Sequence, residues 1–283
     1  MTHQPTPSID GHTELIVHLG FPTQGFRSPR IYNPYFAAQG IRAVVVPMAC
    51  RAHDLAQVLP ALFRLDNVRG ALITMPLKVA VVSLLDEVSM AVQVAGACNA
   101  VRRTVDGRLV GELFDGEGFV QGALRKGVVL KGARALVVGC GGVGRAIAAA
   151  LAGEGLAELR LFDAQPTQSA ELCQRLRAVY ADLDVVQVAA PDPCDLDLVV
   201  NATPLGMYAQ DPLPFQAERL SPHTLVGDVV LEPAVTPLIR AASAAGCRTQ
   251  VGEDMLYEQI PAYLRFFGLP VTTPECLRQL AGR

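Results

Sequence analysis

The sequence predicts an α/β protein with two domains. The chain has 283 residues, more than one domain usually holds, and 51% of them are hydrophobic, which is enough for two buried cores. Short apolar runs that are typical of buried parallel strands alternate with helical stretches. A glycine cluster within residues 135–151 separates an apolar run from an Ala-rich run, which predicts a strand, a tight turn and a helix.

Residues 1–115 are expected to form the first α/β domain. Apolar runs predict its strands at 15–19, 42–47 and 70–74. Helical stretches are expected between and after them, at 29–39, 53–64 and 76–87. Asp106-Gly107 between two further strand candidates favours a hairpin turn. A glycine-rich link over 111–118 then leads to a helix expected at 119–126.

Residues 116–250 are expected to form a doubly wound domain of the Rossmann type. After the glycine cluster, strand candidates follow at 158–162, 184–189, 197–200 and 225–230. The final helical stretch, 253–268, ends at the stop signal Gly268-Leu-Pro270.

Three residues of the glycine cluster, Gly139, Gly141 and Gly144, fit the G-x-G-x-x-G fingerprint of dinucleotide-binding turns. The first glycine permits the turn, the second lets a pyrophosphate approach the backbone, and the third lets helix and strand pack closely. The helix N-terminus then presents free N–H groups to the phosphates. Glycine-rich turns also occur where nothing binds, so a merely structural role is the alternative.

Asp163 ends the next strand, about 20 residues beyond Gly144, where a ribose-binding carboxylate is expected. Its charge would repel a 2′-phosphate, and residues 164–168 offer no cation to hold one. The sequence therefore favours NAD as the cofactor over NADP. The alternative is a strand-end aspartate that only caps the following turn.

Composition narrows the range of partners. The formal net charge is −3 and the chain has no basic run, which argues against nucleic acid. The first apolar run, 15–19, is too short for a signal peptide, so we expect a cytoplasmic protein without a membrane segment. The seven cysteines form no C-x-x-C pair and predict reduced thiols. The five histidines lack ligand-type spacing, so no metal is predicted.

Lys78, Asp115 and Asn99 are the residues that could carry chemistry. Lys78 would lie in the first turn of a predicted helix that Thr74 caps, and a cation at that end of a helix dipole favours a general base. The alternative roles are structural: Lys78 would be a solvated surface lysine, Asp115 a helix-capping residue and Asn99 a turn residue.

From Gly20 onward, a series of short segments resembles the shikimate dehydrogenase family. The segments are Gly20-Phe-Pro22, Ser28-Pro29, Thr74-Met-Pro76-Leu-Lys78, Gly96-Ala-Cys-Asn99, Asp115-Gly116, Gly139-Cys-Gly-Gly142, Asn201-Ala-Thr-Pro-Leu-Gly-Met207, Thr236-Pro-Leu238 and Met255-Leu-Tyr-Glu-Gln259. The resemblance implies an N-terminal substrate domain that residues 251–283 complete. It also implies a Rossmann domain between these parts and a cleft where the nicotinamide meets the substrate.

The resemblance assigns roles by position. Lys78 and Asp115 match the catalytic pair. The matching substrate contacts are Ser28, Thr74, Asn99 and Gln259. Asn201, Thr203 and Met207 match the loop beside the cofactor. With them, the expected cofactor contacts are Gly139, Gly141, Gly142, Val143, Gly144, Asp163 and Gly252.

Several positions depart from the family pattern. The family's serine pair appears as Phe26 and Ser28, and its threonine before the catalytic aspartate is Phe114. The other departures are Gly25 for a histidine, Leu72 for an asparagine, Leu231 for a tyrosine and Asp163-Ala-Gln165 for the Asn-Arg-Thr of NADP-using members. We therefore expect a more apolar substrate pocket, with Phe26 and Phe114 facing the substrate, and a preference for NAD.

The activity that this resemblance implies is the reversible oxidation of a ring secondary alcohol of shikimate or a relative. The partner would be a small cyclic hydroxy acid, and a homodimer is left open. Quinate, an amino-shikimate or another cyclic alcohol is an alternative substrate. A homologue that senses a ligand without turnover is an alternative of another class.

Overall fold

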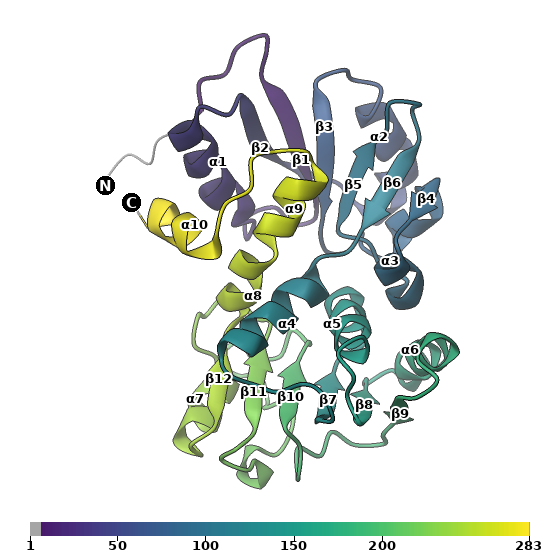
Figure 1. The fold of residues 1–283 in the computed structure, drawn as a ribbon, viewed down its shortest axis with the longest axis vertical. Coiled ribbons are helices and arrows are strands. Elements are labelled where there is room, and N and C mark those ends of the chain that lie inside the picture. The colour runs from purple at the N-terminus through teal and green to yellow at the C-terminus, as the bar shows by residue number, and fades with distance from the viewer. Residues whose placement is uncertain (1–6, 283) are drawn as a thin grey trace. The chain divides into compact units, whose positions relative to one another are not determined.

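The computed structural model describes residues 7–282, which form two compact units (Figure 1). The first unit comprises Met1–Phe114 and Ile260–Arg283, and the second comprises Asp115–Gln259. Each unit contains one six-stranded sheet with helices packed on it. The predicted α/β class is therefore confirmed. The chain returns to the first unit at Ile260, so residues 251–259, which were expected in the first domain, group with the second unit.

The sheet of the first unit has the strand order β2-β1-β3-β5-β6-β4. Its strands are β1 (Glu14–Gly20), β2 (Ala43–Ala49), β3 (Val68–Ile73), β4 (Glu87–Val88), β5 (Ala100–Arg103) and β6 (Leu109–Glu112). β1 lies between β2 and β3 and runs parallel to both, as the apolar runs predict. β5 and β6 form the expected hairpin, in which Gly107 has a φ of 89°. Because β1 and β3 are parallel, their carboxyl ends lie side by side.

The helices of the first unit come from both ends of the chain. They are α1 (Ser28–Gln39), α2 (Leu55–Leu62), α3 (Met90–Ala95), α9 (Ile260–Phe266) and α10 (Pro274–Ala281). α10 packs beside α1 (Figure 1), and the Tyr35 hydroxyl donates a 2.7 Å hydrogen bond to the carbonyl of Pro270. Arg69 Nη1 donates to the Phe267 carbonyl at 2.7 Å. The C-terminal segment thus completes the N-terminal unit.

The predicted helix at 76–87 is wrong. This segment contains only a short 3-10 helix, Ala80–Leu84, and Lys78 lies in the turn before it. Three of the four residues at 79–82 are valine, whose β-branched side chains disfavour an α-helix. Lys78 is therefore not in the first turn of an α-helix, so a helix dipole does not make it a better general base.

Two further helix boundaries differ from the prediction. The helix expected at 119–126 begins earlier, as α4 (Asp115–Arg125). The stretch 253–268 is divided at Gln259 into α8 (Gly252–Glu258) and α9. Asp115 is consequently the first residue of a helix rather than part of a link.

The sheet of the second unit is parallel throughout, with the order β12-β11-β10-β7-β8-β9. Its strands are β7 (Arg134–Val138), β8 (Glu158–Phe162), β9 (Asp184–Gln187), β10 (Leu198–Asn201), β11 (Leu225–Asp228) and β12 (Arg248–Gln250). The helices that join them are α5 (Gly142–Ala152), α6 (Pro166–Val179) and α7 (Pro237–Ala244). The strand order runs outward from β7 on one side and from β10 on the other. Doubly wound sheets bind ligands at such a switch point.

Within residues 7–282, no helix is long and apolar enough to span a bilayer. The seven cysteines carry free thiols. In the same part of the chain, no group of three or more His, Cys, Asp or Glu side chains could hold a metal ion.

Candidate functional site

The glycine cluster forms the turn between β7 and α5. Gly139 has a φ of 99°, a backbone conformation that favours glycine. A Cβ on Gly144 would lie 1.8 Å from the Gly139 carbonyl oxygen, so only glycine allows this approach of helix to strand. Among the described residues, no atom would lie within 4 Å of a Cβ on Gly141. The first and third glycines therefore shape the turn, and the second faces open space.

The open side of this turn is the N-terminus of α5. Gly142 and Val143 are the first two residues of the helix, and Gly141 at the N-cap position has no side chain that could accept their hydrogen bonds. The first N–H groups of a helix lack intrahelical acceptors and favour an anion. The turn therefore fits the pyrophosphate of a dinucleotide.

Asp163 follows β8 at the same edge of the sheet. Its carboxylate accepts hydrogen bonds from the backbone N–H of Cys140 at 2.6 Å and from that of Gln165 at 2.8 Å. Asp163 thus ties the glycine turn to the start of α6. An ionised carboxylate has about four acceptor positions, so these two bonds leave room for two ribose hydroxyls. Capping and ribose binding are compatible at this residue.

Arg145 places a buried cation next to the glycine turn. The sequence does not predict this, because a cation for a 2′-phosphate is expected just after Asp163 and not in the Ala-rich helix. Arg145 Nε donates to the Cys140 carbonyl at 3.0 Å. Its Nη1 and Nη2 donate to the two carboxylate oxygens of Glu171, at 3.2 and 3.1 Å. The guanidinium is only 5% exposed and already has an anionic partner. Its geometry therefore favours a structural tie between α5 and α6.

The segment that follows β10 is held by a network of polar side chains. Asn201 is fully buried and donates from Nδ2 to the Leu205 carbonyl and to Asp228 Oδ1, at 2.9 and 3.1 Å. Its Oδ1 accepts from the hydroxyl of Thr203 at 2.6 Å. Asp228 Oδ2 accepts from Thr236, the N-cap of α7, at 2.6 Å. These bonds fix the loop that ends at Met207, which is 44% exposed.

Asp228 is a second residue that the sequence analysis missed. Burial raises the pKa of its carboxyl, while the bonds from Thr236 and Asn201 and from the Val230 N–H lower it. The feature of the sequence that could have revealed it is an aspartate near the end of a predicted apolar strand. In the structure, this strand lies next to the one that ends at Asn201. Its role is to position the Asn201 loop at the carboxyl edge of the sheet.

Helix α4 packs closely against α5 and α8 within the second unit. A Cβ on Gly116 would lie 2.1 Å from the Ala146 carbonyl oxygen, and one on Gly118 would lie 2.8 Å from the Gln259 Cβ. Asp115 begins α4 and is 4% exposed. The amide oxygen Oε1 of Gln259 is buried and has no hydrogen-bond partner in the described structure. A ligand donor would satisfy it.

Gly252 begins α8 next to β11. A Cβ there would lie 2.6 Å from the carbonyl oxygen of Val230 and 2.7 Å from that of Val229. This glycine is required by close packing against the backbone. A contact with the cofactor remains a prediction.

In the first unit, the carboxyl ends of β1 and β3 bring Gly20, Thr74 and Phe26 together. The backbone N–H of Thr74 donates to the Leu19 carbonyl at 2.9 Å. A Cβ on Gly20 would lie 2.4 Å from Thr74 Cγ2 and 2.9 Å from Phe26 Cζ. The glycine therefore leaves room for both the threonine and the phenylalanine side chains at this strand end.

Lys78 lies in the turn that follows Thr74 and is only 8% exposed. Its carbonyl accepts from the backbone N–H of Cys98 at 2.8 Å, which ties the turn to the segment before β5. Lysine is almost never buried without a specific role or partner. The alternative of a solvated surface lysine is therefore excluded.

Asn99 is fully buried at the start of β5. Its Oδ1 accepts from the Phe114 N–H at 2.9 Å, whereas its Nδ2 has no hydrogen-bond partner in the described structure. A buried donor without a partner costs about 1–3 kcal/mol, which a ligand acceptor would recover. This geometry matches a substrate contact better than a turn residue.

Phe114 contributes to an aromatic cluster with α9. Its ring meets Tyr263 edge-on at 4.8 Å between centroids and Phe266 at 5.7 Å. The side chain is thus engaged in the core of the first unit, whereas Phe26 is half-buried near Thr74. Ser28 begins α1 and is 8% exposed. The Phe26 ring lies near Thr74, whereas the Phe114 ring packs against α9.

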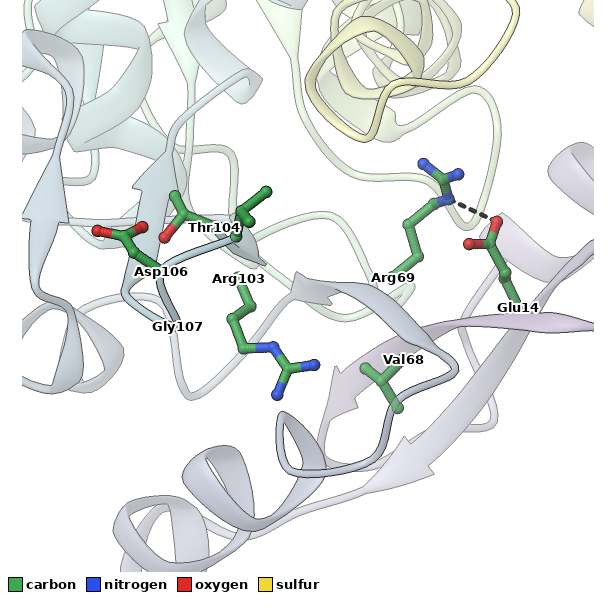
Figure 2. Close-up of a pocket in the computed structure, with 8 residues that line it drawn as sticks. Glu14, Val68, Arg69, Arg103, Thr104, Asp106 and Gly107 are labelled. Atoms are coloured by element: carbon green, nitrogen blue, oxygen red, sulfur yellow. Dashed lines mark hydrogen bonds and ion pairs between the residues drawn. The ribbon is translucent and has the colours of Figure 1, made fainter.

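A hollow of about 570 Å³ lies at the opposite end of the first unit's sheet, between the starts of β1 and β3 and the β5–β6 hairpin (Figure 2). Arg69 in it is paired with Glu14, at 2.7 Å between Nε and Oε2. Arg103 donates to the Phe63 carbonyl. Both arginines are therefore engaged with the protein, and this hollow is distinct from the predicted site residues.

The chain is similar to known proteins over most of its length. Residues 19–101 match the model of the shikimate dehydrogenase substrate binding domain. A shikimate dehydrogenase (NADP(+)) of Rubrobacter xylanophilus is 37% identical over 280 residues, with 98% of each chain covered.

Two solved structures are similar over nearly the whole chain. The shikimate 5-dehydrogenase of Listeria monocytogenes, in complex with shikimate and NAD, has a TM-score of 0.88 at 26% identity, covering 97% of this chain and 98% of the other. The quinate dehydrogenase of Corynebacterium glutamicum, in complex with NAD, has a TM-score of 0.84 at 32% identity, covering 95% and 98%. The chain therefore belongs to the shikimate dehydrogenase family of NAD(P)-dependent oxidoreductases.

Proposed function

We propose that this protein oxidises a ring secondary alcohol of shikimate or a close relative, reversibly and with NAD as its preferred cofactor. The observation that carries the proposal is the burial of Lys78 in the turn after Thr74. A lysine at 8% exposure is suited to proton transfer in a site that excludes water. The unpartnered Nδ2 of Asn99, in the same unit, is suited to a substrate oxygen.

In the proposed reaction, Lys78 takes the proton of the substrate hydroxyl. Asp115 hydrogen-bonds the same hydroxyl and orients it, so the two residues provide acid–base catalysis and positioning together. A bound nicotinamide ring supplies the hydride acceptor. Thr74, Asn99 and Gln259 hold the remaining polar groups of the substrate.

The preference for NAD follows from the charge around the adenosine ribose. The Asp163 carboxylate keeps acceptor positions for both ribose hydroxyls and would repel a 2′-phosphate. The buried cation nearby, Arg145, is paired with both oxygens of Glu171 and is not available to a phosphate. Among the relatives, the Listeria and Corynebacterium proteins bind NAD, and the Rubrobacter protein is named for NADP.

Quinate is the second candidate substrate. Phe26 packs beside Thr74 and cannot hydrogen-bond a carboxylate, so the pocket differs from one lined by serine hydroxyls. The Corynebacterium quinate dehydrogenase is 32% identical to this chain.

One assay tests the function: reduction of NAD and of NADP with shikimate, quinate and close analogues as substrates. We expect turnover of at least one of these acids, with a much higher kcat/KM for NAD than for NADP. Ligand binding without any NADH production would instead favour a sensing role. A higher kcat/KM with NADP would refute the cofactor assignment.

A further inference from the structure

His18 is a buried polar residue that neither the packing of the fold nor the proposed catalytic mechanism explains. It lies on β1, two residues before Gly20, so its side chain shares a face of the sheet with that position. It is 8% exposed, and its Nδ1 has no hydrogen-bond partner in the described structure. In the parallel register, its neighbour on β3 is Leu72, which offers no polar group.

The surroundings of His18 are those of the predicted substrate contacts. Its ring stacks on Phe26, with 4.0 Å between centroids and 24° between planes. The tip of the same Phe26 ring lies against Gly20 beside Thr74. His18 is therefore connected through the Phe26 ring to the strand end at Gly20, where Thr74 also lies.

His18 is a neutral hydrogen-bonding group. Burial, and secondarily the charge of Lys78, lowers the pKa of its imidazole to about 3. A neutral imidazole has one nitrogen that donates and one that accepts. It can therefore pair with a hydroxyl, which also both donates and accepts, but offers no positive charge to a carboxylate.

A purely structural role does not explain this residue. An unpaired polar atom in a buried position destabilises the fold, and a leucine like its neighbour Leu72 would fill a similar volume without that cost. A buried polar group without a partner in the protein is expected where a ligand supplies one.

We propose that His18 is a specificity-determining residue that hydrogen-bonds a ring hydroxyl of the substrate while Phe26 packs on its imidazole face. The proposal rests on the proposed function, because it assumes a cyclic hydroxy acid near Thr74 and Lys78. It adds that this part of the substrate is recognised by a neutral group on β1, with apolar neighbours in Phe26 and Leu72. The favoured substrates then carry a hydroxyl rather than a charge at this place.

The test compares His18→Leu with His18→Gln, which keeps a donor and an acceptor. Val17→Ala is the matched control, because Val17 is fully buried on the same strand and its side chain points to the other face. KM and kcat for shikimate and quinate, the Kd of each acid by calorimetry, and the thermal unfolding midpoint are measured for all variants.

We expect His18→Leu to raise KM and Kd of the preferred acid about 10-fold, the usual scale for one lost hydrogen bond, with kcat within about 3-fold. Its unfolding midpoint should equal or exceed that of the wild type, because an unpaired buried nitrogen is removed. His18→Gln should recover most of the affinity. Val17→Ala should lower the midpoint and leave KM unchanged.

An unchanged KM and Kd in His18→Leu would overturn the proposal. The proposal would also be overturned if His18→Leu lowered the unfolding midpoint as Val17→Ala does and His18→Gln did not recover the affinity. If the wild type binds an acid but reduces neither NAD nor NADP, the proposed function fails, and the Kd values still decide the role of His18. Absence of binding to either acid would overturn both.

Discussion

Gly141→Ala and Gly144→Ala are a matched pair that separates contact with the cofactor from packing in the glycine turn. Gly141 has φ −73° and ψ −171°, which alanine adopts freely, and its Cβ would meet no atom of residues 7–282 within 4 Å. The Cβ of Gly144→Ala would lie 1.8 Å from the Gly139 carbonyl oxygen, a backbone atom that cannot rotate away. The first change fills open space, and the second forces the strand and helix apart.

The expected magnitudes follow from these contacts. Gly141→Ala should change the unfolding free energy by less than about 0.5 kcal/mol. If its methyl group holds the pyrophosphate away from one N–H, the loss of a charge-assisted hydrogen bond of roughly 1.5–3 kcal/mol weakens binding about 10- to 150-fold. Gly144→Ala should lose about 3 kcal/mol through overpacking, which lowers Tm by roughly 6–12 °C.

Thermal unfolding monitored by circular dichroism and NADH binding monitored by fluorescence measure both quantities on the same samples. The result that would refute the reasoning is tight NADH binding by Gly141→Ala, since the open side of the turn would then not face the pyrophosphate. A Tm for Gly144→Ala equal to that of the wild type would contradict the packing argument.

Three further predictions concern catalysis, cofactor and substrate. Lys78→Ala should lower kcat by about 10²- to 10⁴-fold and leave NAD binding by calorimetry intact; a nearly normal kcat would assign the proton to another group. Asp163→Ala with Ala164→Arg should narrow or reverse the ratio of kcat/KM for NAD to that for NADP, and an unchanged ratio would contradict the charge argument. The wild type should show a KM for shikimate of about 1 mM or more, and Phe26→Ser should lower this KM. Phe114→Thr should instead lower the free energy of unfolding by about 3 kcal/mol, because it opens the aromatic cluster. A low micromolar KM of the wild type in steady-state kinetics would show that Phe26 does not weaken substrate binding.

The second unit was the more predictable half of the fold. Its strands are short apolar runs between helices, and β8 has the boundaries that the sequence predicts, Glu158–Phe162. The helix predicted at 76–87 was wrong because apolar periodicity does not separate an α-helix from a valine-rich turn that closes as a short 3-10 helix. The start of α4 at Asp115 was missed because glycines mark links in a sequence, yet at 116 and 118 they permit close packing of helices.

Sequence patterns located the glycine turn and Asp163, because local spacing defines both. They did not reveal His18 or Asp228, which appear as single polar residues in apolar strands. Their importance depends on neighbours that are distant in the chain, Phe26 and Leu72 for His18 and Asn201 and Thr236 for Asp228. Likewise, only the structure separates Phe26 from Phe114, whose ring packs against α9.

The return of the chain to the first unit at Ile260 has a consequence for biosynthesis. The N-terminal sheet emerges from the ribosome first, but Phe267 and Pro270, whose carbonyls accept bonds from Arg69 and Tyr35, are made only after the whole second unit. At about 5–20 residues per second, the intervening segment Asp115–Gln259 takes roughly 7–30 s to synthesise. During that time the nascent N-terminal unit exposes the apolar surface that α9 and α10 later cover. A translation product ending near residue 259 should therefore hold a folded second unit and an aggregation-prone first one.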